Sequence, residues 1–127
     1  MLSQTVTAVL DAPRDEVFAF LSDVDNLPLW ATEFARELRH DGDRTVVVNG
    51  LGEFIFSIEA DDETGVIDMY ADGALFPTRV GPLDADRSAY TFTMFKSPDA
   101  PDELFDSQFR SLLREFDNIR NRFGARP

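Results

Sequence analysis

The side chains that could carry acid–base or nucleophilic chemistry are few in this sequence. It contains no cysteine and a single histidine, His40. Disulfides, thiolate metal sites and cysteine nucleophiles are therefore excluded, and a Ser-His-Asp triad would have to use His40. That residue lies in the run LRHDGD beside an Asp-Gly turn signal, where side chains usually face solvent. We expect an exposed turn residue rather than a general base.

Carboxylate pairs offer another route to general acid–base catalysis. Candidates in the strand-like part of the chain are Glu53, Glu59 and Asp68. Because the chain has 24 Asp and Glu residues, such pairs arise easily by chance, and no pair stands out. The sequence predicts no metal site and no cofactor.

Two polar residues in strand-like runs are weak catalytic candidates. Tyr90 could supply a hydroxyl group for hydrogen bonding or proton transfer, and Arg79 could bind a ligand carboxylate or phenolate. Arg79 is out of phase with Phe76, Thr78 and Val80, however, which favours an outward side chain. An inward Arg79 stays the alternative.

Apolar and aromatic residues repeat on one face of several predicted elements. On the strands they recur at every second residue, and on the last helix at every third or fourth. These faces would oppose one another and could line a ligand cavity, although a fully packed core fits the same pattern. The predicted lining residues are Trp30, Phe34, Phe54, Phe56, Met69, Phe76, Tyr90, Phe92, Met94, Phe109, Leu112 and Phe116.

The element expected to position this face is a long helix over residues 102–124. Its apolar residues form one wide stripe that contains four Phe: Phe105, Phe109, Leu112, Leu113, Phe116, Ile119 and Phe123. Gly124 is a plausible C-cap. At about 1.5 Å per residue the helix would span roughly 33 Å, enough to cross a whole sheet. The stripe must be buried, and a sheet is the only large surface available.

The preceding segments predict that sheet. We expect a strand over residues 4–11, a helix from Pro13 to about Ser22, and a short second helix over residues 26–30, capped by Asp23 or Asp25. Six strand-like runs follow, separated mostly by Asp-Gly, Asn-Gly and similar turn signals. Short turns join antiparallel neighbours, so these runs predict a meander. The runs are 35–40, 44–49, 53–60, 65–71, 74–81 and 88–95.

This order of elements resembles the helix-grip fold of the START-like (SRPBCC) superfamily, which includes the polyketide cyclase/dehydrase and lipid-transport group. The local resemblance lies in the entry APRDEVFAFLSDVDNLPLWA and the ending SAYTFTMF, followed by a Pro-containing linker and the Phe-rich helix. It implies an α+β domain in which a curved antiparallel sheet of about seven strands wraps around the C-terminal helix and encloses a cavity for apolar or amphipathic molecules. The chain is short for that fold, which implies a small cavity. It lacks the two-His-one-carboxylate set of the superfamily's ring hydroxylases.

Composition and charge narrow the function classes. We expect one domain over residues 1–127 with a substantial core, since 43% of residues are hydrophobic and no linker-like segment occurs. The net charge of −12 disfavours nucleic acid and anionic membrane surfaces as partners. The basic residues near the C-terminus, opposite the acidic start of the last helix, fit its dipole better than they fit an anion-binding stripe. Without a signal peptide or membrane span, the cytoplasm is the expected location.

Three functions remain open from these observations. The leading prediction is a protein that binds a small apolar or aromatic molecule between the sheet and the last helix. The alternatives are a cyclase- or dehydrase-type enzyme acting on a hydrophobic, polyketide-like substrate, and an acidic module that binds a basic protein. The sequence leaves the oligomeric state and the identity of the ligand open.

Overall fold

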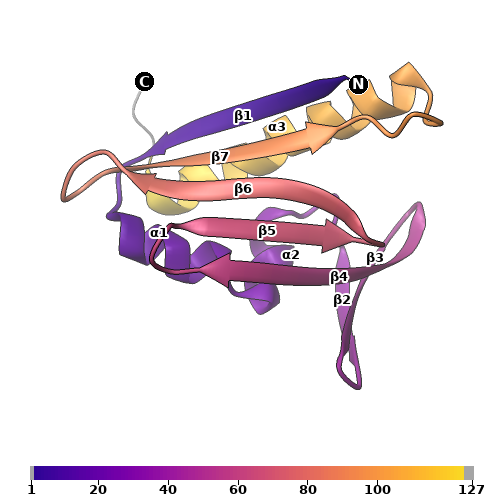
Figure 1. The fold of residues 1–127 in the computed structure, drawn as a ribbon, viewed down its shortest axis with the longest axis horizontal. Helices are drawn as coiled ribbons and strands as arrows, with labels where there is room; N and C mark the ends of the chain where they lie inside the picture. Colours follow the sequence, from indigo (N-terminus) through magenta and orange to yellow (C-terminus); the bar gives the residue numbers. More distant parts are fainter. Residues whose placement is uncertain (1, 125–127) are drawn as a thin grey trace.

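A computed structural model describes residues 2–124, and Arg126 of the predicted basic end lies outside them. These residues form seven strands, three α-helices and one short 3-10 helix, η1 (Figure 1). In chain order they are β1 Ser3–Leu10, α1 Arg14–Leu21, η1 Val24–Asn26, α2 Leu27–Trp30, β2 Glu37–Asp41, β3 Arg44–Asn49, β4 Gly52–Asp61, β5 Val66–Ala71, β6 Ala74–Pro82, β7 Ser88–Phe95 and α3 Asp102–Phe123. The predicted elements are all present, with ends shifted by at most two residues.

All seven strands belong to one antiparallel sheet in the order β1-β7-β6-β5-β4-β3-β2. β2 to β7 form the predicted meander, and β1 pairs with β7 along its whole length, from Ser3 opposite Phe95 to Leu10 opposite Ser88. The longer β6–β7 connection closes with a hydrogen bond from the Leu83 amide to the Arg87 carbonyl (3.0 Å). Figure 1 shows the helices gathered on one side of this sheet, with α3 running behind β7 and β6.

Local sequence signals explain where the helices begin and end. A proline in extended conformation precedes both longer helices, Pro13 before α1 and Pro101 before α3. The side chain of Asp23, one of the two predicted caps, accepts a hydrogen bond from the Asp25 amide at the start of η1. Gly124 follows α3 with φ +79°, a conformation that glycine adopts without strain, as expected for a C-cap.

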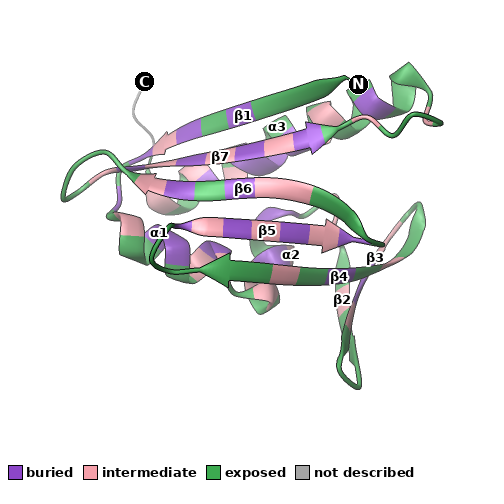
Figure 2. Cartoon of the chain, in the orientation of Figure 1, coloured by how far each residue is buried: buried purple, intermediate pink, exposed green. Residues whose placement is uncertain are grey.

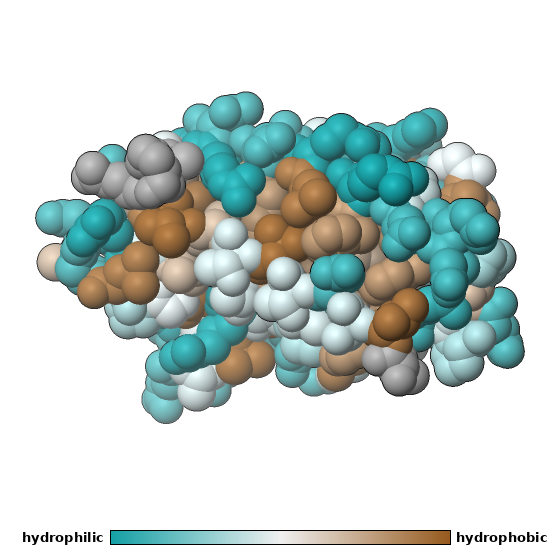
Figure 3. All heavy atoms as spheres, turned by 90° about the horizontal axis from the view of Figure 1, so that it is seen from above, coloured by the Kyte–Doolittle hydropathy of each residue, from teal (hydrophilic) through white to brown (hydrophobic). Residues whose placement is uncertain are grey.

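The core lies where α3 meets the inner face of the sheet. Along α3 the side chains of Phe105, Leu112, Phe116 and Ile119 are buried, and Figure 2 shows matching buried positions along β5, β6 and β7. Leu113 departs from the prediction. It is 42% exposed, because the adjacent Leu112 already occupies the sheet-facing position. Figure 3 views the molecule from above, on the side where β1 lies. It shows apolar side chains across the middle of the visible surface, between hydrophilic margins.

The charge distribution along α3 matches its dipole, as predicted. Asp102 and Glu103 occupy its first turn, and Arg120 and Arg122 its last. The arginines do not form a free stripe, because Arg120 pairs with Asp117 (3.1 Å) and Arg122 lies over the Phe20 ring (4.1 Å to its centroid). No helix in the described part of the chain has the length and apolar character needed to cross a lipid bilayer.

Candidate ligand-binding cavity

A cavity of about 770 Å³ lies between the inner face of the sheet and the N-terminal half of α3. Its walls come from β4 to β7, from α2 and the loop after it, and from α3. Most of its lining is apolar, and several positions that could have filled it carry small side chains, among them Ala31, Ala71 and Ala74. The sequence left open whether the space beneath the last helix is hollow or packed. It is hollow beside the N-terminal half of α3.

Nine of the twelve predicted lining residues border this cavity: Trp30, Phe34, Phe54, Phe56, Met69, Phe76, Phe92, Met94 and Leu112. The other three, Tyr90, Phe109 and Phe116, do not border it. Tyr90 and Phe116 are fully buried and stack on each other with ring centroids 5.5 Å apart. Phe109 directly follows the lining residue Gln108 on α3 and packs against the core instead. Alternation therefore gives the correct inward face, but it does not show where along that face the packing becomes dense.

The mouth of the cavity lies at the end formed by the β3–β4 turn and the linker before α3. Leu51 in the turn, Phe95 at the end of β7 and Leu104 in the first turn of α3 all line the cavity and are exposed. Arg36, also exposed, is the only lysine or arginine among the lining residues of this described cavity. An apolar molecule could enter between these side chains.

The main polar group of the cavity is Glu115 on α3, which was not among the residues predicted from the sequence. This residue lines the cavity although it is only 4% exposed. Its Oε2 atom accepts hydrogen bonds from the amides of Glu33 (3.1 Å) and Phe34 (3.0 Å), in the turn that follows α2. Those amides belong to no helix or strand ladder, so the carboxylate satisfies donors that would otherwise be unpaired.

Burial raises the pKa of Glu115 from 4.5 to about 7. Removing the carboxylate from water is the main cause, because desolvation disfavours the charged form. The two amide hydrogen bonds and Arg114 oppose the rise, and the nearby carboxylate of Glu33 adds to it. This carboxyl group can therefore gain or lose a proton near neutral pH.

One sequence signal could have identified Glu115. It lies three residues after Leu112 and four before Ile119, so helical spacing places a carboxylate on the buried stripe itself. Carboxylates on such a face are rarely buried without partners. The partner amides lie more than 80 residues away in sequence, which no local pattern could reveal.

The loop between α2 and β2 is held against the cavity by several side chains. Glu33 pairs with Arg114 through two hydrogen bonds (2.6 and 2.9 Å), and Asn118 donates to the Trp30 carbonyl (2.9 Å). From the sheet, Asn49 donates to the carbonyl of Phe34 (2.7 Å). These contacts fix the backbone that presents the two amides to Glu115.

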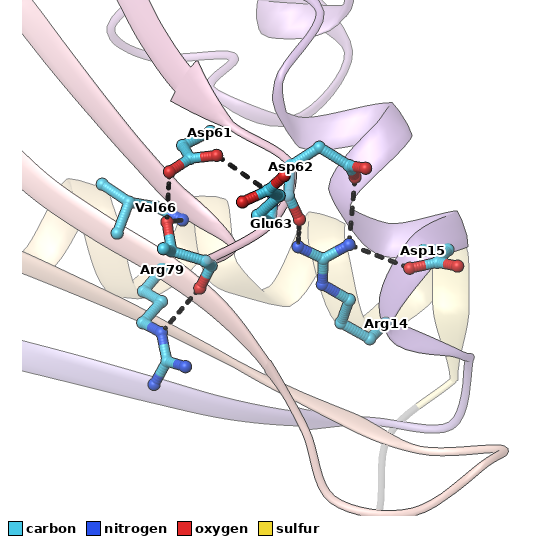
Figure 4. Close-up of polar contacts among 8 residues, drawn as sticks. Arg14, Asp15, Asp61, Asp62, Glu63, Val66 and Arg79 are labelled. Atoms are coloured by element: carbon cyan, nitrogen blue, oxygen red, sulfur yellow. Dashed lines mark hydrogen bonds and ion pairs between the residues drawn. The ribbon is translucent and has the colours of Figure 1, made fainter.

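Arg79 does not reach the cavity. Its side chain is on the outer face of the sheet, and its Nε donates to the Thr64 carbonyl in the β4–β5 turn (3.0 Å), as Figure 4 shows. The same turn is tied to α1, because Arg14 pairs with Asp62 (3.0 Å). A role for Arg79 in binding a ligand inside the cavity is therefore contradicted. Arg79 lies between the buried residues Thr78 and Val80 on β6, so its side chain points outward, as the alternation favoured.

Tyr90 is also separated from the cavity, although it points inward. It is fully buried, and among the described residues Oη meets no hydrogen-bond partner in good geometry; the neighbouring Thr78 hydroxyl donates to the Ile67 carbonyl (2.6 Å). Burial raises the pKa of Tyr90, and Thr78 offsets only part of that rise. The phenol stays neutral and does not contact the space that a ligand would occupy.

The remaining candidate residues lie outside the cavity. His40 is exposed, as expected, but it belongs to β2 rather than to a turn, and its Nε2 lies 2.8 Å from an Asp25 oxygen. Glu53 pairs with Arg39 (2.5 Å). Glu59 and Asp68 lie opposite each other on β4 and β5 and line no part of the cavity. Within residues 2–124, no three His, Asp or Glu side chains converge in a way that could hold a metal ion.

Comparison with known proteins identifies the fold. The sequence matches no protein-family model and no curated protein. Among solved structures it is similar to an uncharacterised protein from Bacillus thuringiensis, with 14% identity, coverage of 96% of this chain and 98% of that one, and a TM-score of 0.76. A START superfamily protein from Mycobacterium smegmatis matches with 13% identity, coverage of 95% and 96%, and a TM-score of 0.70.

An aromatase/cyclase, ZhuI from Streptomyces sp. R1128, is a third similar structure. It shares 18% identity, with coverage of 94% of this chain and 89% of that one and a TM-score of 0.64. The chain therefore has the helix-grip fold of the START-like superfamily, as its sequence indicated. Structural similarity at such low sequence identity shows the fold alone. The function therefore has to be argued from the cavity.

Proposed function

We propose that this protein binds a small apolar or aromatic molecule in the cavity between the sheet and α3. The observation that carries the proposal is the volume of about 770 Å³ with a mostly aromatic and aliphatic lining. Cavities that bind small molecules usually measure roughly 300–1,000 Å³ and are lined by apolar side chains with a few polar groups. The helix-grip fold of the similar structures supports the same conclusion, although it does not name a ligand.

Native mass spectrometry of the purified protein tests this proposal. We expect a mass increase from one hydrophobic molecule, either retained from expression or added as phenylnaphthylamine. Ala71→Phe places a ring in the cavity and should abolish the adduct, since Ala71 lines it and is buried. Thr7→Phe is the matched control, because Thr7 is exposed and outside the lining. Absence of any adduct in the unsubstituted protein, or equal adducts in both variants, would overturn the proposal.

Glu115 favours a second candidate function, that of a cyclase- or dehydrase-type enzyme acting on a hydrophobic, polyketide-like substrate. A carboxyl group with a pKa of about 7 in an apolar cavity can accept or donate a proton near neutral pH. In a dehydration, the Glu115 carboxylate would remove the proton next to a ketone. The protonated Glu115 would then give this proton to the β-hydroxyl group, which leaves as water, so that an enone forms and Glu115 returns to its carboxylate.

Dehydration of an apolar β-hydroxy ketone, followed by the absorbance of the enone, tests this second function. Glu115→Gln removes the proton-accepting group while keeping the shape of the side chain and an oxygen for the two amides. We expect the enone to form with the unsubstituted protein and not with this variant. Equal rates for both would exclude Glu115 as the base.

A further inference from the structure

The carboxyl group of Glu115, which lines the cavity, has one oxygen occupied by backbone amides and one without a protein donor. Oε2 accepts both backbone hydrogen bonds, from the amides of Glu33 and Phe34. Oε1 has no hydrogen-bond partner among the described residues. It is also not sealed in the core, since Tyr90 Oη is the only fully buried side-chain polar atom without a partner there. A carboxylate oxygen without a protein donor, on a side chain that lines a cavity, is suited to a donor from a ligand.

Aromatic rings line the same cavity as this carboxyl group. The amide of Phe34 is one of its two donors, and the Phe34 ring lies 6.1 Å from that of Phe54 and 5.8 Å from that of Phe56, measured between centroids. All three rings line the cavity, as does Trp30. The faces of aromatic rings attract cations, most strongly where water is excluded. A carboxylate next to such rings is a combination that favours a positively charged group over a neutral one.

The charges around the cavity point in the same direction. Of its four charged lining residues, Glu33, Asp72 and Glu115 are acidic and Arg36 is basic. Glu33 is paired with Arg114, which lies beside Glu115 on α3, and Arg36 is exposed near the mouth. The net charge of the whole chain, −12, raises the local concentration of cations and repels anions.

We propose that the ligand of this cavity is an organic cation, namely a protonated amine on an apolar aromatic or aliphatic body. Its ammonium group donates to Oε1 of Glu115, and its body lies against the rings of the cavity wall. This inference rests on the proposed binding function and assigns the ligand class and the residue that selects it. The occupied Oε2 holds the carboxyl group in place, so Oε1 is oriented before the ligand arrives.

Binding of such a ligand is coupled to a proton. The ammonium group favours ionised Glu115, whose pKa in the empty cavity is about 7, so binding should lower that pKa and release a proton near neutral pH. Amine affinity should therefore rise between about pH 6 and about pH 8. The other charged groups near this site are Glu33, Arg36, Asp72 and Arg114. The hydrogen bonds between Glu33 and Arg114 lower the pKa of Glu33 and raise that of Arg114, so this pair keeps its charges over that range.

Isothermal titration calorimetry with three matched probes tests the inference: naphthylmethylamine, naphthylmethanol and naphthylacetate. We expect the amine to bind about 10-fold or more tightly than the alcohol at about pH 8, and the acetate to bind most weakly. Repeating the amine titration near pH 7 in buffers with different ionisation enthalpies should reveal proton release. In Glu115→Gln the preference for the amine and the proton release should both disappear, whereas binding of the alcohol should remain within about threefold.

The possible outcomes separate this inference from the function on which it rests. If the alcohol binds as tightly as the amine and Glu115→Gln changes neither, the cavity binds apolar molecules but the assignment of a cation is wrong. Tightest binding of the acetate would also overturn it, and would point to Arg36 instead. Binding of none of the three probes would contradict the proposed function itself. Glu59→Gln removes an exposed carboxylate that lines no part of the cavity and serves as the control, with the amine preference retained.

Discussion

Two adjacent residues of α3, Glu115 and Phe116, point into two very different halves of the same interface. Phe116 is fully buried, stacks on Tyr90 (5.5 Å between centroids, 19° between planes) and forms a T-shaped pair with Phe92 (6.3 Å between centroids). Glu115 instead borders a cavity of about 770 Å³. The comparison shows how one sheet and one helix serve two purposes. Dense aromatic packing stabilises one half, and small side chains such as Ala71 leave the other half open.

The packed half should dominate the stability of the fold. Phe116→Ala removes a ring with no exposed surface, and we expect it to lower the free energy of unfolding by about 4 kcal/mol. Urea denaturation followed by circular dichroism measures this loss. A loss below about 1 kcal/mol would mean that the interface is not densely packed at this position.

The carboxyl group of Glu115 should make stability depend on pH in the opposite sense to an ordinary ion-paired acid. Its pKa is about 7 in the folded state against 4.5 ordinarily, so the folded state holds the proton more tightly. That stabilisation is complete below about pH 4.5 and is lost as the pH rises through about 7. Relative to Glu115→Gln, the unsubstituted protein should therefore lose about 3 kcal/mol between about pH 4 and about pH 8.

Urea denaturation of both proteins across that range checks this prediction, because effects of the other carboxylates cancel in the difference. A difference that stays constant with pH would show that Glu115 is exposed to water rather than buried at the cavity.

Loss of an aromatic ring on the cavity side should lower the free energy of unfolding less than Phe116→Ala does, and should lower ligand affinity more. Phe76 lines the cavity and is half-buried, so Phe76→Ala leaves no new sealed void. We expect a loss of only about 1–2 kcal/mol in unfolding free energy, from the lost burial of apolar surface. Affinity for phenylnaphthylamine should fall, whereas the refolded Phe116→Ala protein should retain it. Equal stability losses for the two variants would remove the distinction between the halves.

The smallest effect is expected on the outer face of the sheet. Arg79→Ala removes one exposed hydrogen bond to the Thr64 carbonyl, so the loss of stability should be about 0.5 kcal/mol. Ligand affinity should not change, because Arg79 is separated from the cavity by the sheet. Urea denaturation of this variant measures the change in stability. Fluorescence titration with phenylnaphthylamine measures the affinity, and a clear loss of affinity would make Arg79 a binding residue after all.

The fold could be predicted from sequence because its signals are local. Asp-Gly and Asn-Gly turns place the hairpins, the alternation in β7 sets its inward face, and the spacing in α3 sets its buried stripe. Gly124 and the two prolines before α1 and α3 mark helix ends. Each of these depends on residues a few positions apart.

The site could be predicted only in part, because its decisive features are long-range. The lining face follows from alternation. The boundary between the packed half, where Phe116 lies, and the open half, where Glu115 lies, depends on which side chains of other elements fill the space. The two amides that hold Glu115 lie in a turn more than 80 residues earlier. Ala31 and Ala71 keep the cavity open. The sequence alone does not show whether a small side chain such as alanine faces a cavity or a larger neighbour that fills the space.

The central claim, that the space beneath α3 is a binding cavity, has a direct test in Trp30. It is the only tryptophan of the chain, and it lines the cavity while contacting the ring of Tyr90 (6.4 Å between centroids). Titration with phenylnaphthylamine should transfer the emission of Trp30 to the bound dye and saturate at one dye per protein. This signal should be lost in Ala71→Phe and kept in Thr7→Phe. Emission that does not saturate, or that saturates equally in Ala71→Phe, would contradict the account.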